Sequence, residues 1–143
     1  MARALERARE ARERNEVPVG AVVVHGGRIL AEGHNRTVEW CDPTAHAEVV
    51  VLRKAAHRLG DWRLTDATLY VTLEPCTQCA GASVLARISR LVYGAPDPKS
   101  GMVGSLGNLV QDPRLNHRMR VTSGVLAEAS GRLLKEFFRE RRG

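Results

Sequence analysis

Four segments of the chain carry apolar residues at the three- and four-residue spacing of an amphipathic helix. The first covers residues 2–15, and its apolar stripe consists of Ala4, Leu5, Ala8 and Ala11. The second begins at Asp42-Pro43 or Thr44 and ends at Leu59, where Gly60 follows. The third covers residues 75–87, and the last runs from residue 125 to the arginines near the C-terminus. The pattern therefore predicts four helices.

Short runs rich in β-branched residues lie between these helices and predict strands. They cover residues 19–24, 29–35, 68–73 and 90–93, and a fifth strand is expected around Val121. Gly26-Gly27 joins the first two as a β-hairpin, so the sheet should be mixed rather than purely parallel. Because helices alternate with strands, we expect an α/β fold with helices on both faces of the sheet. Residues 94–118, rich in Gly and Pro, should form a long loop that carries function or covers a site.

The composition is that of one folded domain spanning residues 1–143, since 43% of the residues are hydrophobic and 27% are charged. The longest uncharged run near the N-terminus, residues 17–24, is far shorter than the roughly 20 residues of a membrane-spanning helix. The first sixteen residues lack the apolar core of a secretory signal, which predicts a cytoplasmic location. Three cysteines, an odd number, argue against a disulfide framework and favour metal or catalytic chemistry.

Charge points to the class of partner. The chain has 22 Lys and Arg against 16 Asp and Glu, a formal net charge of +6 at pH 7. Such a surplus suits a polyanion, so nucleic acid is an expected partner. A membrane is not, because no uncharged segment is long enough to cross a bilayer.

Two short segments, each at the start of a predicted helix, carry the residue types of a metal site. Cys76 and Cys79 are three residues apart and share a helix face, and the positive end of the helix dipole favours their thiolate forms. A catalytic zinc ion needs three protein ligands and an open position for water, and His46 supplies the third ligand if the two helix starts converge. Glu48 reaches the same site if that site lies off the helix end, where it can take and return the proton of metal-bound water.

The same residues are also compatible with a structural zinc ion, or with a helix-opening histidine beside two buried reduced thiols. A structural site normally has a fourth Cys or His ligand, and the chain has no second pair of ligands at such spacing. Cys41 is the one remaining cysteine, and we expect it to be an uncoordinated loop thiol. The pattern therefore favours catalytic Zn²⁺, with one ion per subunit.

The H-x-E and P-C-x-x-C motifs together are the signature of zinc-dependent base deaminases, and the chain resembles the bacterial tRNA-specific adenosine deaminases. The resemblance covers nearly the whole chain and is carried by Val17-Pro18-Val19-Gly20-Ala21, Gly33-His34-Asn35-Arg36, Asp42-Pro43-Thr44-Ala45-His46-Ala47-Glu48, Ala67-Thr68-Leu69-Tyr70-Val71-Thr72-Leu73-Glu74-Pro75-Cys76, Cys79-Ala80-Gly81-Ala82, Gly104-Ser105-Leu106 and Asn116-His117-Arg118. It implies a cytidine deaminase-like fold, a three-layer α/β/α sandwich with a mixed five-stranded sheet, in a homodimer. It also implies hydrolytic deamination of the wobble adenosine of a tRNA anticodon stem-loop to inosine.

The resemblance implies roles for the residues that match the family motifs. His46, Cys76 and Cys79 match the zinc ligands, and Glu48 matches the proton shuttle that serves N1 of the adenine and then the departing amino group. Asn35 resembles the asparagine that holds the flipped nucleoside, although at the end of a predicted strand it can also simply satisfy a turn.

Two further groups match family positions that contact RNA. Asp97, Lys99 and Ser100 match a loop that contacts the nucleotide beside the target, and Phe138 and Arg142 match a C-terminal helix that closes over the loop nucleotides. Taken alone, Asp97 is also a turn residue between two prolines and Phe138 is also a candidate for the core. The chain departs from the family pattern in an N-terminal helix about one turn shorter and in Pro98 beside a contact residue.

Two other functions are also considered. A deaminase of free nucleosides or bases would share the zinc site, but the net charge, the arginine-rich last helix and Asn116-His117-Arg118 argue against it. A zinc-stapled RNA-binding module without turnover belongs to another class, and Glu48 beside the metal argues against that function.

Overall fold

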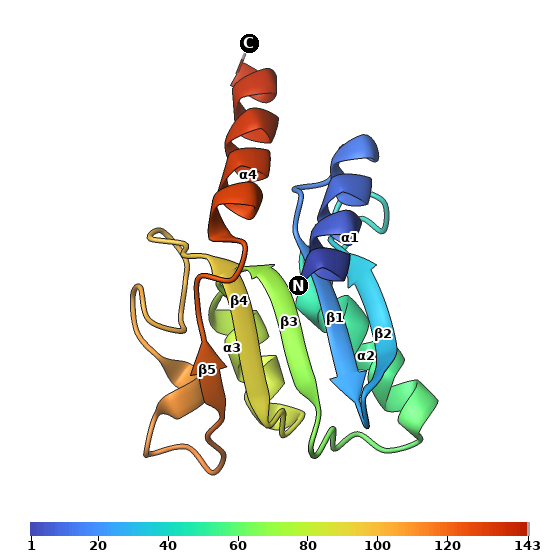
Figure 1. Cartoon of the computed structure of the whole chain (residues 1–143), viewed down its shortest axis with the longest axis vertical. Helices are drawn as coiled ribbons and strands as arrows, with labels where there is room; N and C mark the ends of the chain where they lie inside the picture. The colour runs from blue at the N-terminus through green and yellow to red at the C-terminus, as the bar shows by residue number, and fades with distance from the viewer. Residues whose placement is uncertain (143) are drawn as a thin grey trace.

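The computed structural model describes residues 1–142 (Figure 1). Within them the elements follow in the order α1 (Ala2–Glu13), β1 (Gly20–His25), β2 (Arg28–His34), α2 (Ala47–Leu59), β3 (Thr68–Leu73), α3 (Thr77–Leu85), β4 (Arg90–Ala95), the 3-10 turn η1 (Leu109–Gln111), β5 (Arg120–Thr122) and α4 (Ala127–Arg142). Every helix and strand predicted from the hydrophobic pattern is present, and the ends of several are shorter by a few residues.

The five strands form one mixed sheet in the order β2-β1-β3-β4-β5. Strand β1 runs antiparallel to both β2 and β3, whereas β3, β4 and β5 run parallel to one another. The hairpin between β1 and β2 turns at Gly26 and Gly27, whose φ values of 59° and 74° favour glycine. The predicted mixed five-stranded sheet is confirmed.

Helices cover both faces of this sheet, with α1 and α4 on one face and α2 and α3 on the other (Figure 1). Glycines let two of them approach closely. A Cβ atom on Gly20 of β1 would lie 2.0 Å from the Ala4 carbonyl oxygen of α1, and a Cβ atom on Gly94 of β4 would lie 2.9 Å from Ser130 Oγ of α4. The expected three-layer α/β/α arrangement is therefore confirmed.

Two apolar clusters hold the layers together. The larger one joins the sheet to α2 and α3 and includes Val23, Val51, Leu69, Val71, Val84 and Leu91. The smaller one joins α1 to α4 through Leu5, Ala8 and Leu133. The stripe of α1 predicted from the sequence is buried along its whole length, which explains why this arginine- and glutamate-rich segment folds as a helix on the sheet.

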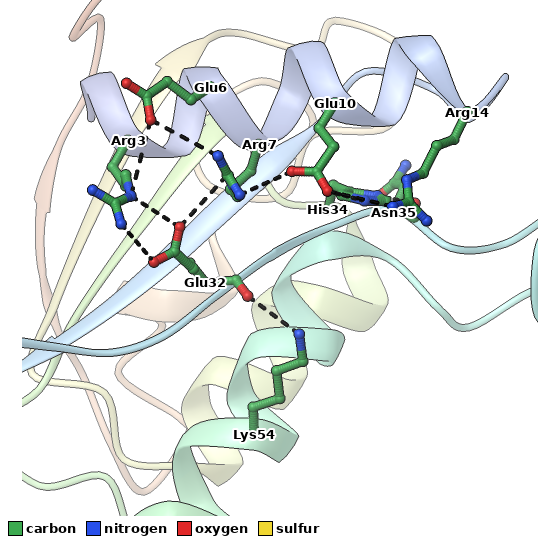
Figure 2. Close-up of polar contacts among 9 residues, drawn as sticks. All are labelled: Arg3, Glu6, Arg7, Glu10, Arg14, Glu32, His34, Asn35 and Lys54. Carbon is green, nitrogen blue, oxygen red and sulfur yellow. Dashed lines mark hydrogen bonds and ion pairs between the residues drawn. The ribbon is translucent and has the colours of Figure 1, made fainter.

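The polar side of α1 is fixed to β2 by ion pairs (Figure 2). Arg3 and Arg7 lie 2.9 and 3.5 Å from the Glu32 carboxylate, and Arg7 also lies 2.9 Å from Glu10. Lys54 of α2 donates a hydrogen bond to the Glu32 carbonyl oxygen at 3.3 Å. These pairs are partly exposed, so they contribute more to the register of α1 on β2 than to stability.

Helix α2 begins later than predicted. The predicted start at residues 42–44 is wrong because Asp42 Oδ1 accepts hydrogen bonds from the backbone N–H of Thr44 at 2.8 Å and from its hydroxyl at 2.7 Å. Such a side-chain turn competes with helical hydrogen bonding. The helix therefore starts at Ala47, and His46 precedes it in an extended conformation.

Helix α3 also begins later than predicted, at Thr77 rather than Pro75. The Pro75 carbonyl accepts a hydrogen bond from the backbone N–H of Met102 at 2.9 Å, and Cys76 is extended. His46 and Cys76, two of the candidate ligands, are thus both extended and directly precede a helix, α2 and α3 respectively.

The segment between β4 and β5 is long and mostly irregular, as predicted, and contains η1 and an isolated bridge between Val103 and Asn108. Leu126 precedes α4 with a φ of 55°, so α4 begins at Ala127 rather than at Val125. In the described part of the chain, none of the helices has both the length and the apolarity needed to cross a bilayer.

Candidate active site

Three potential metal ligands lie together where α2 and α3 begin. His46 directly precedes α2, Cys76 directly precedes α3, and Cys79 lies in the first turn of α3. His46 Nδ1 is 3.5 Å from Cys76 Sγ and 3.4 Å from Cys79 Sγ, and the three ligand atoms all lie within 4.8 Å of one another. The structure therefore brings together all three residues that the motifs single out.

The spacing of these atoms fits a zinc ion. Tetrahedral bonds from zinc to a nitrogen and a sulfur place those two atoms about 3.6 Å apart, close to both observed distances. Within residues 1–142 the potential metal ligands that lie together are His46, Cys76 and Cys79. Cys41 is exposed and does not belong to this group. Three ligands leave a position for water, which is the pattern of catalytic rather than structural zinc.

The two thiols of the group differ in acidity. A hydrogen bond from Cys79 and the neighbouring His46 lower the pKa of Cys76 to about 3, in spite of burial. The pKa of Cys79 is raised because this thiol keeps the proton that it shares with Cys76 and because it is buried. Cys76 is therefore the thiol that loses its proton more readily, and binding of a divalent cation favours loss of the second proton.

Glu48 is a buried carboxyl group beside this cluster. It lies in the first turn of α2 and only 4% of it is exposed. The net pKa of Glu48 is raised to about 7. Burial is the largest cause; a hydrogen bond from its own backbone N–H lowers the pKa, and the nearby Cys76 raises it. A carboxyl group with a pKa near neutrality can both accept and return a proton.

A cavity of about 570 Å³ opens over these residues, within the size range of small-molecule sites. His46, Glu48 and Cys76 line it on the side of the metal ligands, and most of its remaining wall is apolar. It is therefore a space in which a planar base can contact the metal ligands and the carboxyl group together.

Asn35 lines the cavity at the end of β2. Its side-chain Oδ1 accepts a hydrogen bond from the backbone N–H of Ala47 at 2.6 Å. Because that N–H can only donate, the oxygen of the amide must face it, and the Nδ2 group is the one left for a ligand. The simpler interpretation, an asparagine that satisfies a turn, is thus replaced by an asparagine that caps the first turn of α2 from another strand.

The loop after β4 forms a second wall. Asp97 and Ser100 line the cavity, whereas Lys99 is exposed and does not line it. Asp97 Oδ1 accepts hydrogen bonds from the backbone N–H groups of Lys99 at 3.1 Å and Ser100 at 3.3 Å. The Asp97 side chain therefore shapes its own turn as well as facing the cavity.

Helix α4 forms a third wall. Phe138 lines the cavity with 44% of its surface exposed, while Phe137 beside it is buried and lies edge-on to it at 5.3 Å between ring centroids. Arg141 also lines the cavity, 4.2 Å above the Phe137 ring, and donates to the Asn15 carbonyl oxygen at 3.1 Å. Arg142, the arginine singled out from the sequence, is exposed and does not line the cavity.

Several cavity residues were not found by sequence reasoning. They are Asn15, Glu16, Val17, Val19, Thr37, Val38, Leu73, Glu74, Phe137 and Arg141. The doublet of phenylalanines and the run of arginines were visible signals for the last two. Both phenylalanines line the cavity, whereas which arginine faces it depends on how α4 is rotated on the sheet. Nothing in the local pattern distinguishes Glu16 and Glu74 from surface glutamates.

Comparison with known proteins places the chain among deaminases. The sequence profile of the MafB19-like deaminase family matches residues 1–142. A tRNA-specific adenosine deaminase of Bacillus subtilis (strain 168) is 51% identical over 142 residues, which is 99% of this chain and 88% of that protein. Another, from Agrobacterium fabrum (strain C58 / ATCC 33970), is 52% identical over 139 residues, which is 97% of this chain and 91% of that protein.

Solved structures are similar in the same way. A structure from biochemical and structural studies of A-to-I editing by tRNA:A34 deaminases at the wobble position of transfer RNA has a TM-score of 0.91 and 51% identity, with 94% of this chain and 97% of that chain covered. A guanine deaminase from Nitrosomonas europaea has a TM-score of 0.81 and 26% identity, with 94% and 80% covered.

Proposed function

The chain belongs to the family of tRNA-specific adenosine deaminases, and on that premise we propose that it converts the wobble adenosine of a tRNA anticodon loop to inosine with one zinc ion per subunit. The observation that carries this proposal is the convergence of His46, Cys76 and Cys79 beside the buried Glu48 in one cavity. A site with three such ligands, an adjacent carboxyl group and room for a base suits hydrolytic removal of an amino group.

The protein's own residues supply the proton transfers and the orientation. A zinc ion held by His46, Cys76 and Cys79 would supply a water molecule of lowered pKa as the nucleophile for C6 of the adenine. Glu48 accepts one proton of that water and delivers it to N1. It then takes the proton of the hydroxyl group now on C6 and gives it to the amino group, which departs as ammonia as the C6–N bond breaks. Asn35 donates from its Nδ2 group to the bound nucleoside and keeps the start of α2 in place.

The walls of the cavity suit a base that belongs to a polynucleotide. The exposed face of Phe138 at the cavity provides an aromatic surface on which a loop base can stack. Arg139, Arg141 and Arg142 in the last turn of α4 provide positive charge for phosphate groups. Asp97 and Ser100 line the wall that would contact the nucleotide beside the target, and Lys99 is exposed in the same loop.

The test compares substrates. The purified protein with zinc should form inosine in an anticodon stem-loop that has adenosine at the wobble position, and should leave free adenosine, cytidine and guanine nearly unchanged, because contacts to the stem and loop supply the binding energy that orients the base. The same stem-loop with guanosine at that position measures the background. Affinity should fall steeply between low and physiological salt.

The outcomes separate the candidate functions. Efficient turnover of guanine or free adenosine would overturn the RNA substrate and leave a deaminase of free bases or nucleosides; the Nitrosomonas europaea neighbour is a guanine deaminase. Zinc binding and stem-loop binding without turnover of any of these compounds would instead point to an RNA-binding module.

We also propose that the protein acts as a homodimer in the cytoplasm, as the resemblance implies. The exposed apolar side chains include Leu85 at the end of α3 and Trp62 after α2, and we propose that a second subunit covers such groups. Light scattering of the purified protein should give twice the mass of one chain, and cell fractionation should place it with the soluble proteins.

A further inference from the structure

A second buried carboxylate lies at the cavity, two residues before the first cysteine ligand. Glu74 follows β3 and is 2% exposed. Its oxygens accept hydrogen bonds from the backbone N–H groups of Asp97 at 2.9 Å, Val103 at 3.0 Å and Ser105 at 3.0 Å, and from the Ser105 hydroxyl. The mechanism proposed above gives this carboxylate no part in proton transfer.

All four donors belong to one segment, the part of the β4–β5 loop from residue 97 to residue 105. This segment, which we call the 97–105 loop, has little regular structure of its own. A loop without a hydrogen-bonding ladder keeps a single shape only where other groups satisfy its backbone. The single carboxylate of Glu74 accepts hydrogen bonds from backbone N–H groups at both ends of this loop.

The loop is built tightly around the carboxylate. A Cβ atom on Gly101 would lie 2.2 Å from Glu74 Cδ, so glycine is the residue that allows the backbone to pass there. The backbone on either side of Glu74 also engages neighbouring segments, since Glu74 N–H donates to the Ala95 carbonyl oxygen and Met102 N–H donates to the Pro75 carbonyl oxygen, both at 2.9 Å. The loop is thus anchored to the same short segment that carries Cys76.

We propose that Glu74 is a positioning residue that holds the 97–105 loop, with Asp97 and Ser100 facing the cavity, in the shape that contacts the nucleotide beside the target adenosine. This inference rests on the proposed function for the identity of the ligand. Because Glu74 holds the loop through these hydrogen bonds, the loop is already ordered when the substrate binds.

An amide cannot replace this carboxylate. Glutamine offers one acceptor oxygen and a donor NH₂ group, so in Glu74→Gln at least one backbone N–H of the loop faces another donor. Leaving buried donors unpaired costs about 1–3 kcal/mol, which corresponds to about a 5- to 150-fold change in the opening equilibrium of the loop. In this variant the loop becomes ordered only when the substrate binds, and the free energy needed to order it lowers the affinity for the substrate.

Two measurements test the proposal on the zinc-loaded enzyme. In Glu74→Gln, hydrogen exchange at the amides of Asp97, Val103 and Ser105 should speed up by about fivefold or more. With the stem-loop as substrate, KM should rise about tenfold while kcat changes by less than about threefold, because the loop binds the ground state and the transition state alike. Zinc content should stay at one ion per chain.

Glu16, which also lines the cavity, provides a matched control. This carboxylate is 1% exposed and accepts hydrogen bonds from the backbone N–H groups of Val38 at 3.0 Å and Glu39 at 2.8 Å. Glu16→Gln should therefore speed up exchange at residues 38 and 39 and leave the 97–105 loop protected. Faster exchange of that loop in Glu16→Gln would overturn the proposal, because the effect would then be a general loss of stability.

A second pair of variants keeps the test decisive if Glu74→Gln folds poorly. Ser105→Ala removes one donor, and Gly101→Ala forces the loop away from an intact carboxylate; both should raise KM and loop exchange in the same direction. Unchanged exchange at the loop amides, or a loss of kcat at unchanged KM, would overturn the positioning role. If the wild-type enzyme did not act on the stem-loop at all, the proposed function would fail, and the exchange measurement would still decide whether Glu74 holds the loop.

Discussion

Asn35 Oδ1 accepts the backbone N–H of Ala47 at 2.6 Å, so the residue expected to hold the nucleoside also caps the helix that carries Glu48. The contact joins the end of β2 to the start of α2. It couples the position of a candidate substrate contact to that of His46, which directly precedes the helix. The two functions of Asn35 use different atoms of one amide, and they can therefore be separated by mutation.

Replacing Asn35 by Asp or Ala should separate capping from substrate binding. Asn35→Asp keeps an acceptor for Ala47 N–H at a helix N-terminus, where negative charge is favoured, so its melting temperature should stay near that of the wild type. Asn35→Ala leaves that N–H unpaired and should lose about 1–3 kcal/mol of stability. Both variants lose the Nδ2 donor, so both should deaminate the stem-loop poorly. An Asn35→Asp enzyme of normal activity would show that Nδ2 does not contact the substrate.

The cysteines should differ in their effect on metal content. Cys76→Ser and Cys79→Ser should lose most of the zinc and part of the fold's stability, because the free energy of ligation is also free energy of folding. Cys41 is exposed and lies outside the ligand group, so Cys41→Ser should keep both. Metal analysis and thermal unfolding measure the two effects. Loss of stoichiometric zinc in the Cys41 variant would mean that the ligand set is assigned wrongly.

Glu48→Gln should separate metal binding from catalysis. The three ligand atoms do not include this carboxyl group, so zinc content and stem-loop affinity should be retained. The rate of deamination should fall by at least about 10²–10⁴, the contribution that a positioned proton-transfer group makes. Single-turnover kinetics on the stem-loop measure the loss. Near-normal turnover would remove Glu48 from the mechanism, and loss of zinc would make it a ligand instead.

The parts of the fold that were predictable from the sequence are those set by local pattern. The stripe of α1, the Gly26-Gly27 hairpin and the alternation of helices and strands each depend on spacings of a few residues, and all are found in the structure. The candidate ligands were predictable for the same reason, because a cysteine at the start of a helix and another three residues on share one face wherever the helix lies.

The parts that were not predictable depend on contacts between distant segments. Glu74 differs from a surface glutamate only because the 97–105 loop folds over it, and Glu16 is buried only because residues 38 and 39 return to it. The starts of α2 and α3 shifted because Asp42 and Pro75 have hydrogen bonds that a periodic pattern does not reveal. Arg141 lines the cavity and Arg142 does not, because the rotation of α4 on the sheet decides which side chain faces it, and helical periodicity alone does not give that rotation. The RNA contact expected of Arg142 stays a prediction.

The network in Figure 2 contains a buried histidine whose titration should affect stability. His34 is 1% exposed and its Nδ1 lies 2.7 Å from the Asn35 carbonyl oxygen. Within residues 1–142 its Nε2 has no hydrogen-bond partner, and Glu10 is 3.8 Å away. Burial lowers the pKa of His34, and Arg36 and Arg14 lower it further, while the Asn35 carbonyl and Glu10 raise it; the net direction is downward.

The lowered pKa of His34 predicts that the fold is weakened by mild acid. In the unfolded chain the histidine has a pKa of about 6.5, so the unfolded chain binds the proton more readily than the folded chain. The full stability is therefore present above about pH 6.5. It is lost as the pH falls from about 6.5 toward the lower pKa of the folded state. The loss from one group is at most about 1.4 kcal/mol per pH unit. Urea unfolding at about pH 7.5 and 5.5 should therefore show a larger decrease in the free energy of unfolding for the wild type than for His34→Gln.

His57→Gln, which changes an exposed histidine of α2, should keep the wild-type decrease. Equal decreases in the wild type and His34→Gln would show that His34 binds protons alike in both states.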